Sequence, residues 1–175
     1  MSRDQLEQSR EAAEREARAQ AERITFWTEF VGEGRDMGKL HVLNRSLDPM
    51  NSGWLFVAEV GSPDDSDGQF GLVIAPGKRA HLAIGVIPPC TERIIKVAEL
   101  QAYTPEWNHS KTDLKPLIAN TDKLVFRDRS GQAWTRNDIS LRHGGKFPKF
   151  PVKGNEISFS PRRPAEFDRA VRLCR

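Results

Sequence analysis

Four histidines and two cysteines are the side chains here with the widest chemical repertoire. The histidines are His41, His81, His109 and His143, and none has a second histidine or a cysteine at the spacing of a zinc site. His41 and His81 lie in extended apolar runs, which favours places in a sheet. His109 stands near Trp107 in a long connection, and we expect these two side chains to contribute to an interaction surface. The sequence predicts no metal site and no cofactor.

The cluster of Asp64, Asp65 and Asp67 resembles the start of a calcium-binding loop. Such a loop would need a glutamate at position 75 or 76, where alanine and proline stand. We interpret the cluster as a solvated turn.

No motif for nucleophilic or metal-assisted catalysis is present. The sequence has no G-x-S-x-G elbow, no H-E-x-x-H helix and no phosphate loop. Cys90 has no identifiable base nearby to generate a thiolate. We therefore expect no catalytic residues and a non-enzymatic role.

Cys90 and Cys174 are too few for a disulfide framework. A bridge between them would join the C-terminus to the domain, but spacing cannot show that their geometry permits one. The simpler expectation is reduced thiols in a cytoplasmic protein. Residues 1–23 are dense with charge, and no apolar run approaches the length of a membrane span.

Charge is distributed unevenly along the 175 residues. Residues 1–31 carry two more acidic than basic side chains, and residues 137–175 carry five more basic than acidic ones. The basic segment also contains Phe147 and Phe150, so phosphate pairing with base stacking is one interpretation. Its candidate nucleic-acid-binding residues are Lys146, Lys149, Lys153, Arg162 and Arg163. Alternatively, the phenylalanines pack on the domain, or the segment docks on the acidic-leaning N-terminal region of another copy.

Residues 2–24 are rich in Ala, Glu, Arg and Gln, which favour helix. Ser2 and Gln5 have the spacing of a capping box. Positions alternately four and three apart form a partly apolar seam, with Leu6, Ala13, Ala17 and Ile24 as its interaction residues. Three interpretations stay open: a solvated helix, a self-associating or partner-binding coiled coil, and a membrane-surface helix.

Extended runs begin at Ile24. Short β-branched and aromatic segments separated by Gly and Pro predict seven or eight antiparallel strands rather than βαβ units. They lie at residues 24–31, 39–45, 54–60, 70–74, 80–87 and 93–98, and in a hairpin over 123–136. In the hairpin, Ser130 and Gly131 supply the turn, and Phe126 and Trp134 need other strands to cover them. Residues 157–160 are a candidate edge strand, and 164–175 predict a short helix.

Three segments carry a resemblance to a group of proteins. They are Leu43-Asn44-Arg45-Ser46 with Pro49, then Ile87-Pro88-Pro89-Cys90-Thr91, and Phe126 to Trp134 (FRDRSGQAW). Over about residues 22–136 the chain resembles small uncharacterised bacterial proteins in which a charged, Ala-rich helix precedes an immunoglobulin-like β-sandwich. The resemblance implies a fold more than an activity.

The predicted protein is mainly β: an antiparallel immunoglobulin-like β-sandwich preceded by a long helix and followed by a basic extension. The expected divisions are residues 1–24, 25–136 and 137–175. The leading functional hypothesis is an intracellular protein–protein interaction or assembly module, with the helix mediating oligomerisation or partner docking. The alternative is a nucleic-acid-binding accessory protein that uses the basic extension.

Overall fold

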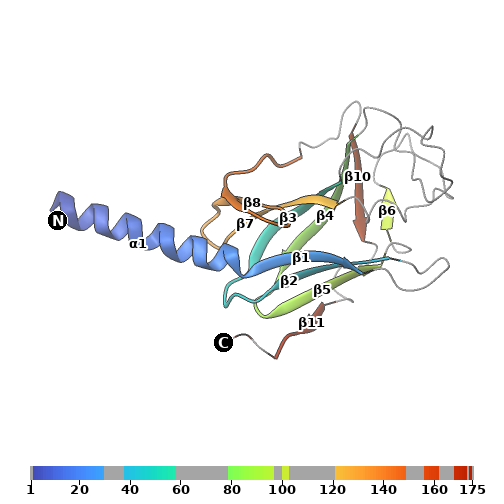
Figure 1. Ribbon diagram of the computed structural model, residues 1–175, viewed down its shortest axis with the longest axis horizontal. Coiled ribbons are helices and arrows are strands. Elements are labelled where there is room, and N and C mark those ends of the chain that lie inside the picture. The colour runs from blue at the N-terminus through green and yellow to red at the C-terminus, as the bar shows by residue number, and fades with distance from the viewer. Residues whose placement is uncertain are drawn as a thin grey trace.

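A computed structural model describes residues 2–29, 38–57, 79–96, 100–102, 121–148, 156–161, 168–172 and 174. In this part of the chain, an N-terminal helix extends away from one end of a domain built from two β-sheets (Figure 1). The protein is mainly β, as predicted. None of the helical residues described forms a stretch both long and apolar enough to cross a bilayer.

Helix α1 spans Arg3–Glu22, and its start has the predicted cap. The Ser2 hydroxyl accepts a hydrogen bond from the backbone N–H of Gln5, and the Gln5 side chain accepts one from the backbone N–H of Ser2. This reciprocal pair satisfies two donors that the first helical turn would otherwise leave open. Arg23 caps the other end, and the chain enters its first strand at the next residue.

Over the described ranges the strands form two sheets. The first sheet has the order β1-β2-β5-β11, and the second has the order β6-β10-β4-β3-β7-β8-β9. In the first sheet the strands are β1 Ile24–Glu29, β2 Lys39–Asn44, β5 Thr91–Lys96 and β11 Asp168–Ala170. In the second they are β3 Met50–Val57, β4 Arg79–Ile87, β6 Leu100–Ala102, β7 Thr121–Arg127, β8 Ala133–Arg136, β9 Leu141–His143 and β10 Glu156–Pro161. Neighbouring strands are antiparallel, apart from the parallel pair of β10 and β4.

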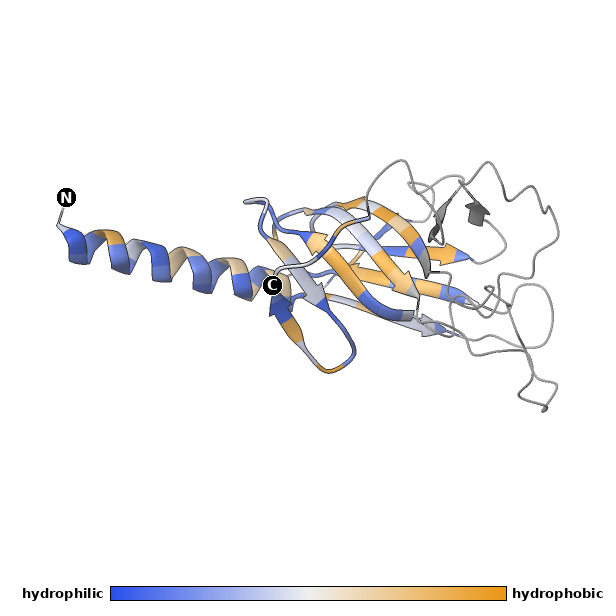
Figure 2. Ribbon diagram, turned by 90° about the horizontal axis from the view of Figure 1, so that it is seen from above, coloured by the Kyte–Doolittle hydropathy of each residue, from blue (hydrophilic) through white to orange (hydrophobic). Residues whose placement is uncertain are grey.

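The two sheets share one hydrophobic core. The first sheet contributes Ile24, Leu40, Val42 and Ile95, and the second contributes residues from β3, β4, β7 and β8. Hydrophobic positions are concentrated in the strands, whereas the projecting helix is mostly hydrophilic (Figure 2). Burial along β2 and β5 does not simply alternate, because both strands also bury polar residues, among them His41, Glu92 and Arg93.

The predicted hairpin is confirmed as β7 and β8. Phe126 pairs directly with Trp134, and both side chains are buried in the shared core. Gly131 adopts a positive φ of 84°, which glycine tolerates without the strain that a Cβ would add. Most of the other predicted strands also form, since β1 to β5 overlap the segments expected at 24–31, 39–45, 54–60, 80–87 and 93–98.

The C-terminal region departs from prediction. The helix expected at 164–175 is wrong for residues 168–170, because these form β11 beside β5. Strand β10 confirms the extended segment near 157–160, but it lies between β4 and β6 instead of at an edge. Strands from residues 137–175 therefore belong to both sheets, so residue 136 does not end the β domain.

The cysteines also differ from expectation. Cys90 and Cys174 form a disulfide with their Cα atoms 5.4 Å apart, and neither is free. The prediction of reduced thiols is wrong for this structure. Sequence could not reveal the pairing because the two residues are 84 positions apart and meet only when β11 pairs with β5.

The strand expected at 70–74 and the aspartate cluster at 64, 65 and 67 lie outside the described residues.

Candidate functional site

Helix α1 touches the β domain only near its C-terminal end within the described structure. Ala21 is fully buried, Gln20 is nearly so, and Ala17 packs partly against the core. Every other residue of α1 is exposed. Most of the helix surface is thus available to a partner.

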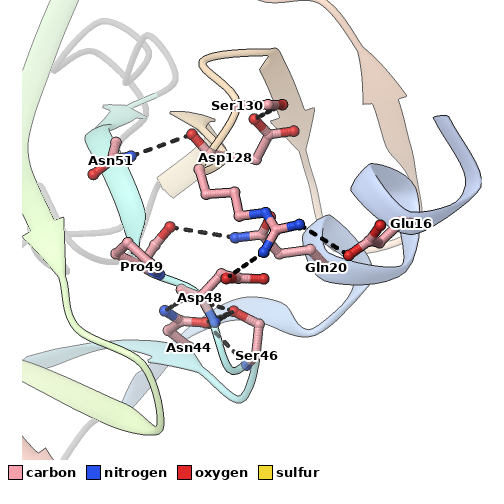
Figure 3. Close-up of polar contacts among 10 residues, drawn as sticks. Glu16, Gln20, Asn44, Ser46, Asp48, Pro49, Asn51, Asp128 and Ser130 are labelled. Carbon is pink, nitrogen blue, oxygen red and sulfur yellow. Dashed lines mark hydrogen bonds and ion pairs between the residues drawn. The ribbon is translucent and has the colours of Figure 1, made fainter. Parts of the chain in front are cut away.

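The base of α1 is positioned by polar contacts to two turns (Figure 3). Arg129, in the β7–β8 turn, donates from Nη2 to Glu16 Oε1 at 3.0 Å and from Nη1 to Asp48 Oδ1 at 3.1 Å. Gln20 donates from Nε2 to the backbone carbonyl of Pro49 at 3.3 Å. Exposed ion pairs contribute little stability each. Their consequence here is orientation: contacts from two turns set the direction in which the helix leaves the domain.

The β2–β3 turn that receives these contacts is itself held by Asn44. This fully buried amide donates from Nδ2 to the backbone carbonyls of Asp48, Ile87 and Pro88, at 2.8, 3.2 and 3.0 Å. Its Oδ1 accepts from the backbone N–H and hydroxyl of Ser46. A fully bonded buried amide of this kind fixes local backbone geometry. The turn is therefore a firm platform for the helix.

An apolar stripe runs outward from the docked end of α1. Ala17 and Ala21 lie on the side that meets the domain, and at 3.6 residues per turn Leu6, Arg10 and Ala13 continue that side. Leu6 is 47% exposed, and Ala13 is also exposed. We call Leu6, Arg10, Ala13 and Ala17 the helix stripe. Its inner end packs against the protein's own core, and its outer end faces solvent.

The predicted interaction seam stays a prediction, and the structure shows only where its residues lie. Leu6 and Ala13 are accessible, and Ala17 is partly covered by the domain. Ile24 is not available, because it is a fully buried residue of β1 and the helix has already ended at Glu22. The sequence assigned Ile24 both to the seam and to the first strand, and the structure places it in the strand.

Most of the other predicted site residues lie outside the described residues. This applies to Trp107, His109, Lys149, Lys153, Arg162 and Arg163. Lys146 is described and exposed, in the segment after β9. The interaction surface at the long connection and the nucleic-acid-binding role both stay predictions.

A charged cluster that sequence reasoning missed spans all the strands described in the first sheet. His41 lies between two carboxylates on the face of the sheet opposite the core, with Nδ1 2.7 Å from Glu92 Oε1 and Nε2 3.0 Å from Glu29 Oε2. Arg169 Nε donates to Glu92 Oε2 at 2.6 Å, and Lys39 pairs with Glu29 at 3.6 Å. We call these five residues the charge ladder, since basic and acidic side chains alternate across it.

The charge ladder has no free group for nucleophilic or metal chemistry. Both ring nitrogens of His41 are engaged, and the two contacts are satisfied together when the imidazole donates from both. The Trp27 ring stacks on the His41 ring at a centroid distance of 4.8 Å and an interplanar angle of 8°. In the described part of the chain, no three His, Cys, Asp or Glu side chains are grouped so as to hold a metal ion. The arrangement ties strands together.

The ladder makes the carboxylates favour their ionised forms. Burial acts to raise the pKa of Glu92, but hydrogen bonds from His41 and Arg169 outweigh it and leave the pKa below its ordinary value of 4.5. The hydrogen bond from His41 similarly lowers the pKa of Glu29. No motif could have revealed the ladder, because its members are brought together by strand register.

These shifts predict acid sensitivity. A lowered folded-state pKa means that the folded protein binds fewer protons than the unfolded chain, so stability is complete above about pH 4.5 and falls as pH falls through the folded-state pKa. Glu92→Gln is expected to lower the free energy of unfolding by about 2 kcal/mol at pH 7, because the bonds to Arg169 and His41 become weaker. It should also reduce the further loss of stability between pH 7 and pH 3. Urea unfolding between pH 7 and pH 3 tests this, with Glu7→Gln on the exposed helix as the control. If Glu92→Gln lost as much stability between pH 7 and pH 3 as the wild-type protein, the prediction would be wrong.

No protein-family model, curated protein or solved structure matches this chain.

Proposed function

We propose that this protein is a non-enzymatic assembly module in which α1 pairs with α1 of a second copy. The observation that carries the proposal is the helix stripe, which begins in the protein's own core and continues along the solvent-exposed outer turns of α1. Most of the stability of a helix in a protein comes from packing of one of its faces. Packing against a partner would supply the contacts that the domain supplies only at the base.

An antiparallel arrangement of the two helices suits the stripe. It would place Leu6 against the partner's Ala17, and Arg10 against the partner's Ala13. The alanines are small enough to let the helix axes approach closely, so the one large apolar residue of the stripe meets a small one. Arg10 would then lie beside the partner's Glu14, where the opposite charges attract. The two β domains would stand at opposite ends of the pair.

The anchored base supports the same proposal. Because Arg129, Gln20 and the β2–β3 turn hold α1 in one direction, the helix is presented without the entropy cost of ordering a loose arm on binding.

The pairing is tested by solution mass from light scattering over a wide concentration range. We expect the wild-type mass to rise from one chain toward two. Leu6→Lys should weaken dimerisation at least tenfold, since a buried leucine contributes roughly 1.5–3 kcal/mol. Gln8→Lys is the matched control: it adds the same charge on the opposite, exposed side of α1. A wild-type mass of one chain at every concentration would contradict the proposal, as would equal losses in the two variants.

We further propose that the domain is an immunoglobulin-like sandwich. Support comes from two mostly antiparallel sheets around one core, preceded by the charged helix that characterises the bacterial proteins this sequence resembles. The Cys90–Cys174 bond differs from the bond between sheets in antibody domains, because it joins a turn of the domain to its C-terminal tail.

A further inference from the structure

Strand β11 is a short edge strand with one neighbour. Its three residues pair antiparallel with the first half of β5: Asp168 with Arg93, Arg169 with Glu92 and Ala170 with Thr91. Strands in globular proteins average five to six residues. Backbone pairing over three residues at an edge gives little independent stability, so other contacts must keep β11 in place.

Side-chain contacts help to keep β11 on β5. Arg93 donates from Nε and Nη2 to the two carboxylate oxygens of Asp168, each at 2.6 Å, and Arg169 joins Glu92 of the charge ladder. Beyond the strand, the backbone N–H of Val171 donates to the carbonyl of Cys90 at 2.8 Å. The contacts join β11 and its tail to β5 and to the turn that precedes it.

The disulfide adds a covalent link at the same place. Cys90 directly precedes β5, and Cys174 lies four residues after the end of β11. The bond lies just beyond the β11–β5 pairing. It therefore keeps β11 near β5 even when the hydrogen bonds between the two strands open. Both cysteines are only half-buried, so a small dithiol can reach them.

We propose that the Cys90–Cys174 disulfide is a redox latch that holds β11 on β5. A dithiol reductant transfers two electrons and two protons: the S–S bond breaks, Cys90 and Cys174 become thiols, and the dithiol becomes a disulfide. Strand β11 then opens from the edge more often, and in the open state water replaces Asp168 around Arg93 and the backbone edge of β5 becomes accessible. An exposed edge of this kind is a site for strand addition.

The latch depends on compartment. Disulfides persist in oxidising environments and are rare in the cytosol, where thiol systems keep cysteines reduced. The latch is closed in an oxidising environment and open in the cytosol. The cytoplasmic location predicted from the sequence is thus the one in which β11 would be released.

Hydrogen exchange on the full chain tests the latch, with the protein oxidised and with dithiothreitol present. We expect at least tenfold faster amide exchange in residues 91–96 and 168–172 after reduction, and unchanged exchange in the β7–β8 hairpin. Cys174→Ser should reproduce the reduced pattern without reductant. Because the chain has two cysteines, dithiothreitol should not alter that variant further.

Two outcomes would overturn the latch. Equal protection of 91–96 and 168–172 in both states would make the disulfide a passive staple. Faster exchange throughout, including the β7–β8 hairpin, would show that the bond stabilises the whole domain instead of one edge.

Discussion

Asp168→Ala is expected to lower the free energy of unfolding by about 3 to 5 kcal/mol, because it leaves a buried arginine without its counter-ion. Arg93 is 4% exposed, and Asp168 accepts two of its N–H groups in a bidentate pair. The third contact, from Nη1 to the backbone carbonyl of Ile84 at 2.5 Å, reaches the second sheet and does not neutralise the charge. The guanidinium would have to draw in water or pull away from the core.

Urea unfolding monitored by circular dichroism measures this loss. Asp138→Ala is the matched control, since it removes the same carboxylate from an exposed turn and should change stability by less than about 0.5 kcal/mol. The double variant Arg93→Met with Asp168→Leu is expected to regain much of the loss, because it removes the buried charge together with its partner. A cost below about 1 kcal/mol for Asp168→Ala would show that Arg93 is already solvated.

Asp128→Ala is the second change with a large expected cost, about 3 kcal/mol. Asp128 is fully buried at the end of β7, where Oδ2 accepts from the Trp134 indole N–H at 2.9 Å. Oδ1 accepts from the Ser130 hydroxyl at 2.7 Å and from the backbone N–H of Gln132 at 2.9 Å. Alanine would leave the buried indole N–H of Trp134 without its acceptor, at a cost of about 1–3 kcal/mol, and would remove the bonds that hold Ser130 and Gln132 in the turn.

Thermal unfolding followed by tryptophan fluorescence is the measurement for this site. Asp128→Asn keeps one acceptor oxygen and should give an intermediate loss, whereas Asp122→Ala, on an exposed position of β7, should have little effect. Equal losses in the alanine and asparagine variants would show that charge, and not acceptor number, holds the turn.

Sequence reasoning succeeded where structure depends on neighbouring residues. The capping box of Ser2 and Gln5 and the turn at Gly131 are both set by contacts within a few positions. Leu124 and Phe126 are buried in β7, as their alternation indicated, although Val125 between them is buried as well. Such features carry their physical cause in the local sequence.

Sequence reasoning failed where contacts between residues far apart in the sequence determine the structure. The apolar residues on either side of residues 168–170 are spaced as in a helix. Pairing with β5, the bond from Arg93 to Asp168 and the disulfide override that local preference. The contact between Arg129 and Glu16 joins residues 113 positions apart, and the position of His41 between Glu29 and Glu92 depends on register across three strands. No spacing rule contains that information.

The position of β10 has a consequence for synthesis of the chain. Residues 156–161 return to lie between β4 and β6, and residues 168–170 close the edge of the other sheet. On a ribosome that makes the chain from its N-terminus, both sheets stay incomplete until residues 156–170 have emerged. Until then, β4 and β5 expose unpaired backbone that can join a neighbouring nascent chain. Truncated products that lack both β10 and β11 should therefore aggregate.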